Sequence, residues 1–591
     1  MLKYIKNIFS CPAHRWIARV FGALCSAAWI FLFVVEDHFS LLSFAEKVPL
    51  LPYIGCAAAL FALQALVTPL LKRFDAWFIA VAVTGYASTL MFEYYNLYLL
   101  ITVSLTIAGV FFYLFRDDKL GLVKLQMTTG LGWTVVAIFA LLFVGYTSAF
   151  TVLRYTTYSA STFDLGIFAQ MFHYMRTTGL PLTTCERNEL LSHFAVHFSP
   201  IYYVLLPGYM LFPGPAYLQI AQAVVLGSGV IPLFLLVKQL GHGNRTATVM
   251  CIVYCMYPAL MGGCSYDIHE NCFLAPLLLW LFYCLEKNSA VGIYISAVLT
   301  LLVKEDAAIF VACIGIYSFC YLKHRLHGAV LTVLSVVYFV IVLALLSTYG
   351  DGNFLSWRYS NFIENSDQSF MQIVKVILLN PAYMLLQALN EKKVEFLVQL
   401  LLPLACLPLV GKQIGRLILL VPVLLLNLLT NYEYQHSTNF QYVFGAIAIL
   451  FYLGACNLSR LKAATRRTVL PIMATVTLVF LVATQSYTLI YFQVPPENQE
   501  KLDRITAALE LIPEDASVRT TGFFAPRLAQ RAELYDYKTN VTTDYLALDL
   551  RPGNENITQS TLNIFRYRGY EDVAYEKDLF IIMKYTKETE Q

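Results

Sequence analysis

Charged residues are scarce in this sequence. Only 13% of its 591 residues are Asp, Glu, Lys or Arg, whereas 58% are hydrophobic, and the mean hydropathy is +0.62. Soluble globular domains carry roughly 25% charged residues, so this composition excludes an ordinary soluble protein. The formal net charge of +3 is too small to indicate a nucleic-acid partner.

Two cysteine patterns are also missing. None of the thirteen cysteines belongs to a CxxC pair, and most lie inside apolar runs, as Cys251 and Cys255 do. Cysteine in such a run behaves as a small hydrophobic residue. The sequence therefore indicates neither a disulfide framework nor a zinc site. A signal peptide is not indicated either, because the first apolar run is too long for one.

Apolar runs of spanning length dominate the chain instead. A helix rises 1.5 Å per residue, so about 20 residues cross the hydrocarbon core. The runs between residues 17 and 490 predict about fifteen transmembrane helices in an all-α polytopic membrane protein. The stretch 198–213 is apolar but broken by proline, which predicts a segment at the membrane interface.

The positions of Lys and Arg predict the orientation. With the N-terminus inside, the short inner loops are rich in basic residues, such as Arg116, Lys119 and Arg466. The short outer loops hold almost none beyond Lys47 and Lys304. Cytoplasmic loops are enriched in Lys and Arg. We therefore expect a multi-pass protein of the cell membrane with a cytoplasmic N-terminus and an extracytoplasmic C-terminus.

Three parts are predicted along the chain. Residues 1–130 form a four-helix membrane module, and 131–490 form a transmembrane core with long outer loops at 154–216 and 349–393. Residues 491–591 are polar and combine a helical pattern with strand-like runs such as "YLALDL" and "DLFIIMKY". This pattern predicts a small α/β domain on the outer side. The inner loops are too short to hold a domain.

Five clusters of polar residues fall in the predicted outer loops. The clusters are Asp164; His193 and His197; Asp267, His269 and Glu270; Lys304, Glu305 and Asp306; and Glu433, His436 and Tyr442. Scattered positions would have put some of them on the inner side. We therefore expect the five clusters to converge on one outward-facing cavity.

The charged trio at 304–306 interrupts an apolar stretch that runs from 289 to 322. One straight helix of that length would measure about 50 Å, far more than the roughly 30 Å hydrocarbon core. The stretch is therefore predicted to be a hairpin with a recessed turn, where charges must be paired or face a water-filled cavity. The alternative is a self-neutralised trio at an ordinary helix turn.

Each other cluster has an ordinary alternative as well. Asp164 has the position of a helix N-cap. His193 and His197 have metal-ligand spacing but lack the glutamate of a zinc-protease helix, which favours packing or substrate contact. Asp267 and Glu270 are either candidate ligands of a divalent cation or members of a solvated loop. No other metal or cofactor is indicated.

The polar clusters lie in segments that resemble the DUF2079 family of bacterial and archaeal membrane proteins. These segments are "STFDLGIFAQMF", "NELLSHFAVHFSP", "DIHENCFLAPLLLW", "LLVKEDAAIF" and "YEYQHSTNFQYVFGAIAIL". The resemblance covers most of the chain from about residue 130 and leaves the first four helices outside. That family is similar in layout to the GT-C glycosyltransferases. In those enzymes an aspartate in the first long outer loop is the catalytic base, and the donor is a polyprenyl-phosphate sugar in the outer leaflet.

The resemblance implies an outward-facing glycosyltransferase that passes a sugar from a polyprenyl-phosphate donor to an unidentified acceptor. By loop order Asp164 matches the catalytic aspartate, and Glu305 and Asp306 lie where a second carboxylate would be supplied. The sequence shows no phosphate-binding glycine loop or nucleotide-sugar fold on the cytoplasmic side, which favours a lipid-linked donor.

The departing phosphate needs cations. Lys304 is the first choice, followed by Arg358 and His436. The remaining candidate substrate contacts are His193, His197, His269, Glu270 and Tyr442.

Two other functions remain open from the sequence. One is a transporter or flippase of a polar or lipid-linked substrate, and the other is a non-catalytic membrane scaffold. Transporters place ionisable residues at mid-helix, often in inverted repeats. Here the charges fall at the outer helix ends and no internal repeat is visible, which favours the enzyme. The expected partners are the lipid-linked sugar, its acceptor and the lipid bilayer.

Overall fold

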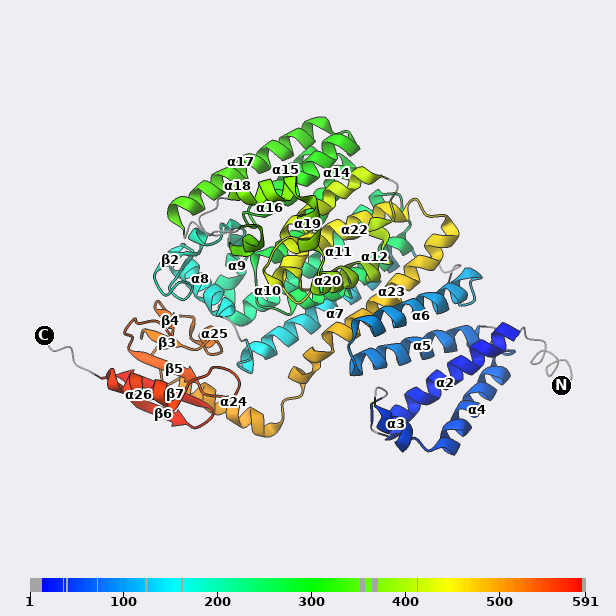
Figure 1. Ribbon diagram of the computed structural model, residues 1–591, viewed down its shortest axis with the longest axis horizontal. Coiled ribbons are helices and arrows are strands. Elements are labelled where there is room, and N and C mark those ends of the chain that lie inside the picture. Colours follow the sequence, from blue (N-terminus) through cyan, green and yellow to red (C-terminus); the bar gives the residue numbers. More distant parts are fainter. Residues whose placement is uncertain are drawn as a thin grey trace.

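Helices make up most of the chain in the computed structural model, and a sheet of five strands forms near the C-terminus (Figure 1). The structure describes residues 13–35, 37–38, 41–71, 73–122, 126–160, 163–350, 357–363, 370–411 and 413–586. The long loop predicted at 349–393 is therefore only partly among the described residues.

The N-terminal helices form a group at one end of the molecule, far from the sheet (Figure 1). They are α2 (Ala13–Val35), α3 (Leu42–Lys47), α4 (Leu50–Val67), α5 (Phe74–Glu93) and α6 (Leu97–Arg116). α5 and α6 pack against α23 (Ala463–Gln485) of the central part. Arg19 and Asp75 form a buried ion pair at 2.7 Å, which lets two apolar helices carry charge.

The central part holds the remaining long helices and several short ones. These helices are α7 (Thr129–Thr156), α8 (Asp164–Thr178), α9 (Leu206–Leu211), α10 (Pro215–Ser228), α11 (Val230–Gln239), α12 (Asn244–Cys255), α13 (Pro258–Cys264), α14 (Leu274–Lys287), α15 (Ala290–Leu301), α16 (Ala307–Tyr317), α17 (Arg325–Tyr349), α18 (Phe370–Leu379), α19 (Pro381–Ala388), α20 (Glu391–Leu401), α21 (Val421–Val423), α22 (Phe444–Leu458) and α23. A two-stranded antiparallel ribbon, β1 (Leu182–Thr183) and β2 (Leu191–Ser192), follows α8.

The predicted class of multi-pass helical membrane protein is confirmed, and its apolar helices differ in length. Within the described residues, nine helices are long and apolar enough to cross a membrane, or eleven if two bent pairs each count as one span. Several apolar runs form short or broken helices instead. The run at 394–410 is interrupted where Ala405 and Cys406 adopt left-handed backbone. The predicted hairpin at 289–322 is confirmed as α15 and α16, with 12 and 11 residues.

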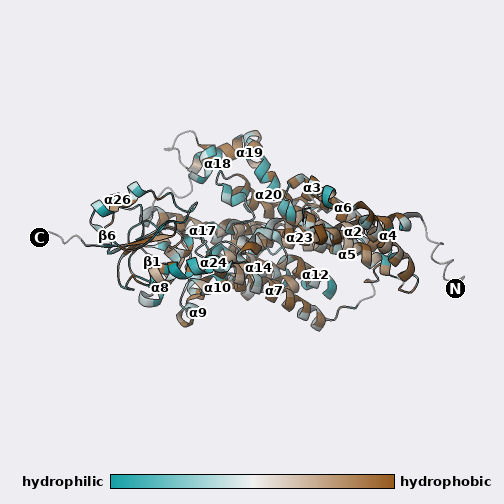
Figure 2. Cartoon of the chain, turned by 90° about the horizontal axis from the view of Figure 1, so that it is seen from below, coloured by the Kyte–Doolittle hydropathy of each residue, from teal (hydrophilic) through white to brown (hydrophobic). Residues whose placement is uncertain are grey.

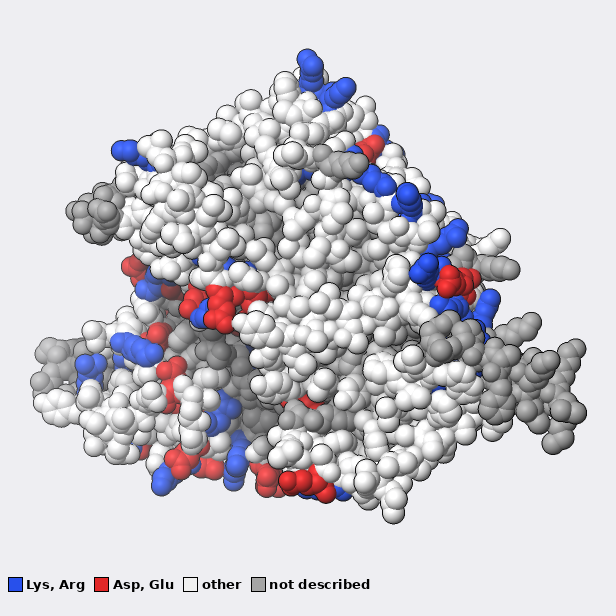
Figure 3. Space-filling model, turned by 45° about the vertical axis from the view of Figure 1, so that its right-hand side comes forward, with Lys and Arg blue, Asp and Glu red and all other residues white. Residues whose placement is uncertain are grey.

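The surface reflects this membrane character. Figure 2 shows apolar residues along most of the helices, and Figure 3 shows charged side chains gathered toward opposite sides of the molecule, with a wide band of other residues between. Leu51 and Leu141 are 82% and 71% exposed. So large an exposed apolar surface marks contact with a lipid bilayer.

The C-terminal part is an α/β domain, as predicted. Its strands follow the order β4-β3-β5-β7-β6; β3 pairs in parallel with β4 and β5, and β7 pairs antiparallel with β5 and β6. Its elements are α24 (Pro496–Leu509), β3 (Val518–Thr520), α25 (Ala525–Leu528), β4 (Leu534–Asp536), β5 (Tyr545–Asp549), α26 (Gln559–Tyr567), β6 (Tyr570–Glu576) and β7 (Phe580–Tyr585).

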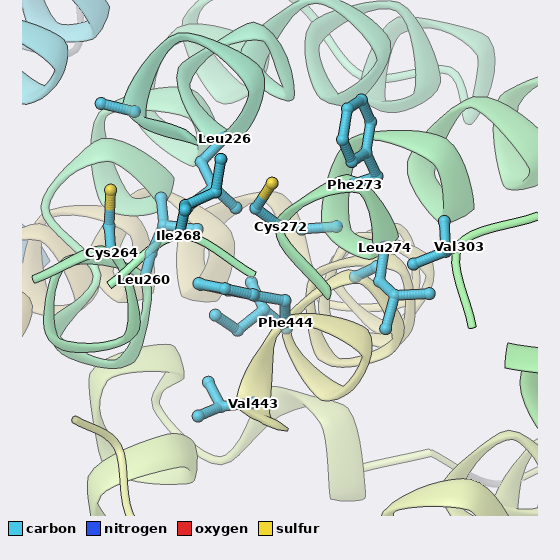
Figure 4. Packing of buried hydrophobic residues seen from close by; sticks show 14 of the residues in the cluster. Leu226, Leu260, Cys264, Ile268, Cys272, Phe273, Leu274, Val303, Val443 and Phe444 are labelled. Carbon is cyan, nitrogen blue, oxygen red and sulfur yellow. The ribbon is translucent and has the colours of Figure 1, made fainter. Parts of the chain in front are cut away.

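An apolar core holds the loops that carry the polar clusters. Ile268, Cys272 and Val303 are fully buried and pack with residues of α10, α13 and α22 (Figure 4). Ile268 and Val303 stand directly next to His269 and Lys304 in the sequence, and Cys272 follows Glu270 by two positions. Packing of the apolar neighbours therefore fixes the backbone positions from which the polar side chains extend.

One buried glutamine joins α8 to the ribbon and to the C-terminal domain. Gln170 Nε2 donates to Thr184 Oγ1 (2.9 Å) and to the carbonyls of Arg531 and Ala532 (3.3 and 3.1 Å). Its Oε1 accepts from the backbone N–H groups of Thr184 and Cys185 (2.9 and 3.0 Å). Gln170 thus connects α8, the ribbon region and the C-terminal domain close to the start of α8.

Replacing Gln170 with leucine is expected to lower stability by about 3 kcal/mol, because several buried backbone groups lose their partners. Thermal unfolding of the detergent-solubilised protein measures the loss, and limited proteolysis at 179–193 reports loosening of the ribbon. The matched control is Gln559→Leu on exposed α26, which should behave as wild type. Equal stability of Q170L and Q559L would contradict this role.

Candidate functional site

Asp164 is the first residue of α8, and its carboxylate is partly exposed. The N-cap position belongs to Phe163, which makes no side-chain cap hydrogen bond, so the alternative of an Asp164 N-cap is wrong. Asp164 Oδ2 accepts from Tyr266 OH (2.6 Å) and lies 3.9 Å from His269 Nε2. Its side chain is 35% exposed. A carboxylate at a helix N-terminus is also favoured by the helix dipole.

His269 is held next to Asp164 by its own loop. Its Nδ1 donates to the backbone carbonyl of Asp267 (3.0 Å), and its ring stacks on Tyr266 with centroids 5.5 Å apart. Asp267 is fully buried; its carboxylate accepts from Arg154 and from Gln219 Nε2. Asp267 therefore anchors the loop, and His269 faces Asp164.

A buried ion pair underlies the site. Lys304 Nζ donates to Glu270 Oε1 (2.7 Å), Tyr202 OH donates to Glu270 Oε2 (2.8 Å), and both charged side chains are at most 2% exposed. Burial raises the pKa of Glu270, but the charge of Lys304 outweighs it, so the pKa falls well below its usual value. Burial lowers the pKa of Lys304, and Glu270 more than reverses this. Both groups are therefore ionised.

The two histidines of the "HFAVH" segment have separate partners. His193 Nδ1 lies 2.9 Å from Glu186 Oε2, and His193 Nε2 is buried without a hydrogen-bond partner among the described residues. Burial lowers the pKa of His193, but Glu186 raises it by more than burial lowers it, so the pKa is raised overall. His197 Nδ1 lies 3.1 Å from Glu305 Oε1. Burial and then Lys304 lower the pKa of His197, so its ring is neutral.

A cavity of about 580 Å³ brings most of the predicted residues together. Its lining comes from α8, the ribbon region, the loop before α14, the hairpin turn and residues 357–358 and 432–442. Of the candidate site residues, it contains Asp164, His193, His197, His269, Lys304, Arg358 and Tyr442.

The other four candidates lie around this cavity. Glu270 is behind Lys304 as its ion-pair partner. Glu305 and Asp306 line a neighbouring cavity of about 410 Å³, which is otherwise almost entirely apolar. His436 lines a third cavity of about 460 Å³. The structure thus brings seven of the candidates to one cavity and leaves Glu270, Glu305, Asp306 and His436 outside its lining.

Arg358 stands where the polar and apolar cavities meet. It lines both of them and is 6% exposed. Its guanidinium lies 5.4–5.5 Å from the ring centroids of Trp357, Tyr432 and Tyr442. Aromatic faces stabilise a cation at this range, so the three rings help to hold the guanidinium of Arg358 in place.

No group of three His, Cys, Asp or Glu side chains in the described part of the chain could hold a metal ion. The two residues considered as cation ligands have other partners. Asp267 accepts from Arg154 and Gln219, and Glu270 accepts from Lys304 and Tyr202. The pairing of Asp267 with Glu270 around a cation therefore has no geometric support.

Several lining residues were not found from the sequence. Glu186 and Arg187 lie in the polar run "CERNEL", whose alternating charges are typical of an ordinary solvent-exposed loop. Tyr266 precedes Asp267 directly, yet nothing in its local sequence predicts a hydrogen bond to a residue 102 positions away. Tyr432 and Tyr434 resemble ordinary membrane-interface aromatics.

The sequence matches the family described as predicted membrane protein (DUF2079) over residues 154–572. The chain belongs to the DUF2079 family. The matched region contains every residue that lines the 580 Å³ cavity, whereas α2 to α6 lie outside it. The DUF2079 region therefore carries the candidate site, and the N-terminal module is additional to it.

No curated protein matches the chain. Among solved structures, the crystal structure of ArnT from Cupriavidus metallidurans bound to undecaprenyl phosphate is similar, with 13% sequence identity and a TM-score of 0.45. The similarity covers 75% of this chain and 97% of that chain.

Lys304→Met is expected to cost about 3–5 kcal/mol, because it leaves Glu270 as an unpaired buried charge. The double variant Lys304→Met/Glu270→Leu should recover much of that loss, since it leaves no lone charge. Unfolding of the solubilised protein in SDS measures both. The ion pair would be contradicted if adding Glu270→Leu to Lys304→Met lowered stability again by the full cost of a second lost contact.

Asp306 is expected to make stability depend on pH. Its Oδ1 is buried without a hydrogen-bond partner among the described residues, and burial raises its pKa to about 6 despite Lys304. The folded state thus favours the protonated form, so stability is lost as pH rises from near 4 through 6. Asp306→Asn should raise the Tm by a few degrees at pH 7.5 and hardly at pH 4.5. A parallel pH profile for wild type and D306N would exclude this effect.

Proposed function

We propose that this chain is a GT-C-type membrane glycosyltransferase that moves a sugar from a polyprenyl-phosphate donor to an acceptor on the outer face of the cell membrane. The N-terminus is then cytoplasmic, and the candidate site and the C-terminal domain face outward. The observation that carries the proposal is the position of Arg358 between a polar cavity with Asp164 and an apolar cavity.

A lipid-linked phosphate needs both environments at once. Its isoprenoid tail requires an apolar channel, and residues such as Ile309, Phe339 and Leu424 line the 410 Å³ cavity. Its phosphate requires a cation at the mouth of that channel. Arg358 meets this requirement by position, because it lines both the polar and the apolar cavity. His436 lines another cavity and does not serve the phosphate.

Asp164 is the proposed general base. The acceptor hydroxyl oxygen attacks the anomeric carbon of the donor, and its proton passes to the Asp164 carboxylate. The bond between the anomeric carbon and the phosphate oxygen breaks, and its electron pair leaves with the polyprenyl phosphate. Tyr266 fixes one carboxylate oxygen at 2.6 Å, and Arg358 stabilises the charge that develops on the phosphate.

Asp164→Asn should reduce transfer by at least about a hundredfold, the usual contribution of a general base. The assay uses the full chain in nanodiscs, radiolabelled polyprenyl-phosphate sugars and solubilised cell-envelope extract as the acceptor source. The matched control is Asp515→Asn, an exposed carboxylate of the C-terminal domain, which should transfer at the wild-type rate.

The outcomes distinguish the candidate functions. Absence of transfer by the wild type with every donor tested would reject the glycosyltransferase. Normal transfer by D164N together with loss of transfer by His193→Gln would assign the proton to the Glu186–His193 pair. A flippase would move a labelled lipid-linked sugar across the vesicle bilayer and form no new glycosidic bond.

A further inference from the structure

A second polar cavity adjoins the candidate site. It measures about 460 Å³ and is lined from four parts of the chain, one of which is the end of α23 with Ala483 and Thr484. Tyr95 comes from the turn between α5 and α6, Glu395 and Gln399 come from α20, and the remaining wall is mostly the loop 433–440. The N-terminal module, which lies outside the family match, thus contributes to a cavity of the central part.

Two aromatic residues separate this cavity from the candidate site. Tyr434 and Phe440 line both cavities, with ring centroids 4.4 Å apart. Phe440 in turn packs on Tyr266 (4.7 Å between centroids), whose hydroxyl donates to Asp164. A molecule in the second cavity therefore lies one aromatic layer away from the proposed base.

Tyr95 organises the polar side chains of this cavity. Its hydroxyl donates to Glu395 Oε1 and accepts from Gln399 Nε2 (2.8 Å). Gln399 Oε1 then accepts from Thr438 Oγ1 (2.6 Å). This network connects the N-terminal module to α20 and to the loop 433–440, so the shape of the cavity depends on the module.

One buried group in the cavity wall lacks a partner. His436 is 7% exposed, and its Nδ1 has no hydrogen-bond partner in the described part of the chain. Burial, and then Lys393, lowers the pKa of His436 to about 4, so the ring is neutral at physiological pH. A buried polar atom without a partner is costly, and a ligand hydroxyl in the cavity would satisfy it.

The charges of the cavity disfavour an anionic ligand. Lys392 is paired with Glu433 (2.9 Å), and Glu395 adds a second carboxylate. The other polar lining consists of neutral groups, including Gln399, Ser437, Thr438 and Asn439. Amides, hydroxyls and carboxylates beside aromatic faces suit a neutral molecule with many hydroxyl groups.

We propose that this second cavity binds the acceptor, a neutral carbohydrate group, and that the N-terminal module completes the acceptor site through Tyr95. The inference rests on the proposed transferase function. The acceptor's hydroxyl reaches Asp164 past Tyr434 and Phe440, while the donor occupies the side of Arg358. The additional module thereby sets acceptor specificity and leaves the donor site unchanged.

The test separates acceptor binding from donor chemistry. Two rates are measured in nanodiscs with a radiolabelled polyprenyl-phosphate sugar: transfer to envelope extract, and hydrolysis of the donor by water without extract. Tyr95→Phe should raise the amount of extract that gives half-maximal transfer about tenfold, the effect of one hydrogen bond to a charged group. The maximal rate and donor hydrolysis should stay unchanged. Tyr98→Phe, at a tyrosine that is 72% exposed, is the matched control.

A second variant distinguishes loss of the acceptor site from misfolding of the N-terminal module. Ser437→Trp fills the cavity from the central part and should abolish transfer while leaving donor hydrolysis and Tm intact. The acceptor site would be overturned if Y95F needed the wild-type amount of extract for half-maximal transfer and S437W transferred sugar normally. If the wild type itself showed neither transfer nor donor hydrolysis, the transferase function would be rejected instead.

The class of acceptor is tested with the same assay. Periodate cleaves vicinal diols, so extract treated with periodate should lose its ability to accept sugar if the acceptor is a carbohydrate. An acceptor that survives periodate, or inhibition of wild-type transfer by inorganic phosphate that is competitive with extract and leaves donor hydrolysis unchanged, would overturn a neutral carbohydrate as the ligand.

Discussion

The buried pair of Glu270 and Lys304 is the interaction on which the site depends. A membrane protein carries a charge in its interior only where an opposite charge and hydrogen bonds compensate for lost hydration. Here the hairpin turn after α15 supplies Lys304, the loop before α14 supplies Glu270, and Tyr202 completes the set at 2.8 Å. Three segments distant in sequence must therefore meet at one point. The cavity with Asp164 forms beside that point because the same loops also carry His269 and His197.

The C-terminal domain supports one wall of the cavity without entering it. All lining residues fall between 164 and 442, yet α8 rests on the domain through Gln170. Gly166 lies so close to α25 that a Cβ there would be 2.9 Å from Ala525 Cβ. This close approach requires glycine one turn or less from the carboxylate of Asp164, and it places the start of α8 against α25 of the C-terminal domain.

Three cavities follow one another within the DUF2079 region. The apolar cavity meets the polar one at Arg358, and the polar one meets the second polar cavity at Tyr434 and Phe440. Each boundary residue has a fixed position: rings surround Arg358, and the two aromatic residues pack on each other. The order of environments matches a substrate with an apolar tail, a charged link and a hydroxylated partner.

The sequence by itself determined the membrane class, the apolar hairpin at 289–322, the α/β domain and the convergence of Asp164, His193, His269 and Lys304. These features depend on composition, run length and loop order, which are local or additive. The sequence did not determine which of the roughly fifteen apolar runs form straight full-length helices, because a broken helix such as the run at 394–410 has the same hydropathy as a straight one. Only the tertiary structure decided which groups pair: Tyr266 with Asp164, Glu186 with His193, Tyr95 with Glu395. Such contacts depend on how distant helices pack, and no local pattern of residues encodes that packing.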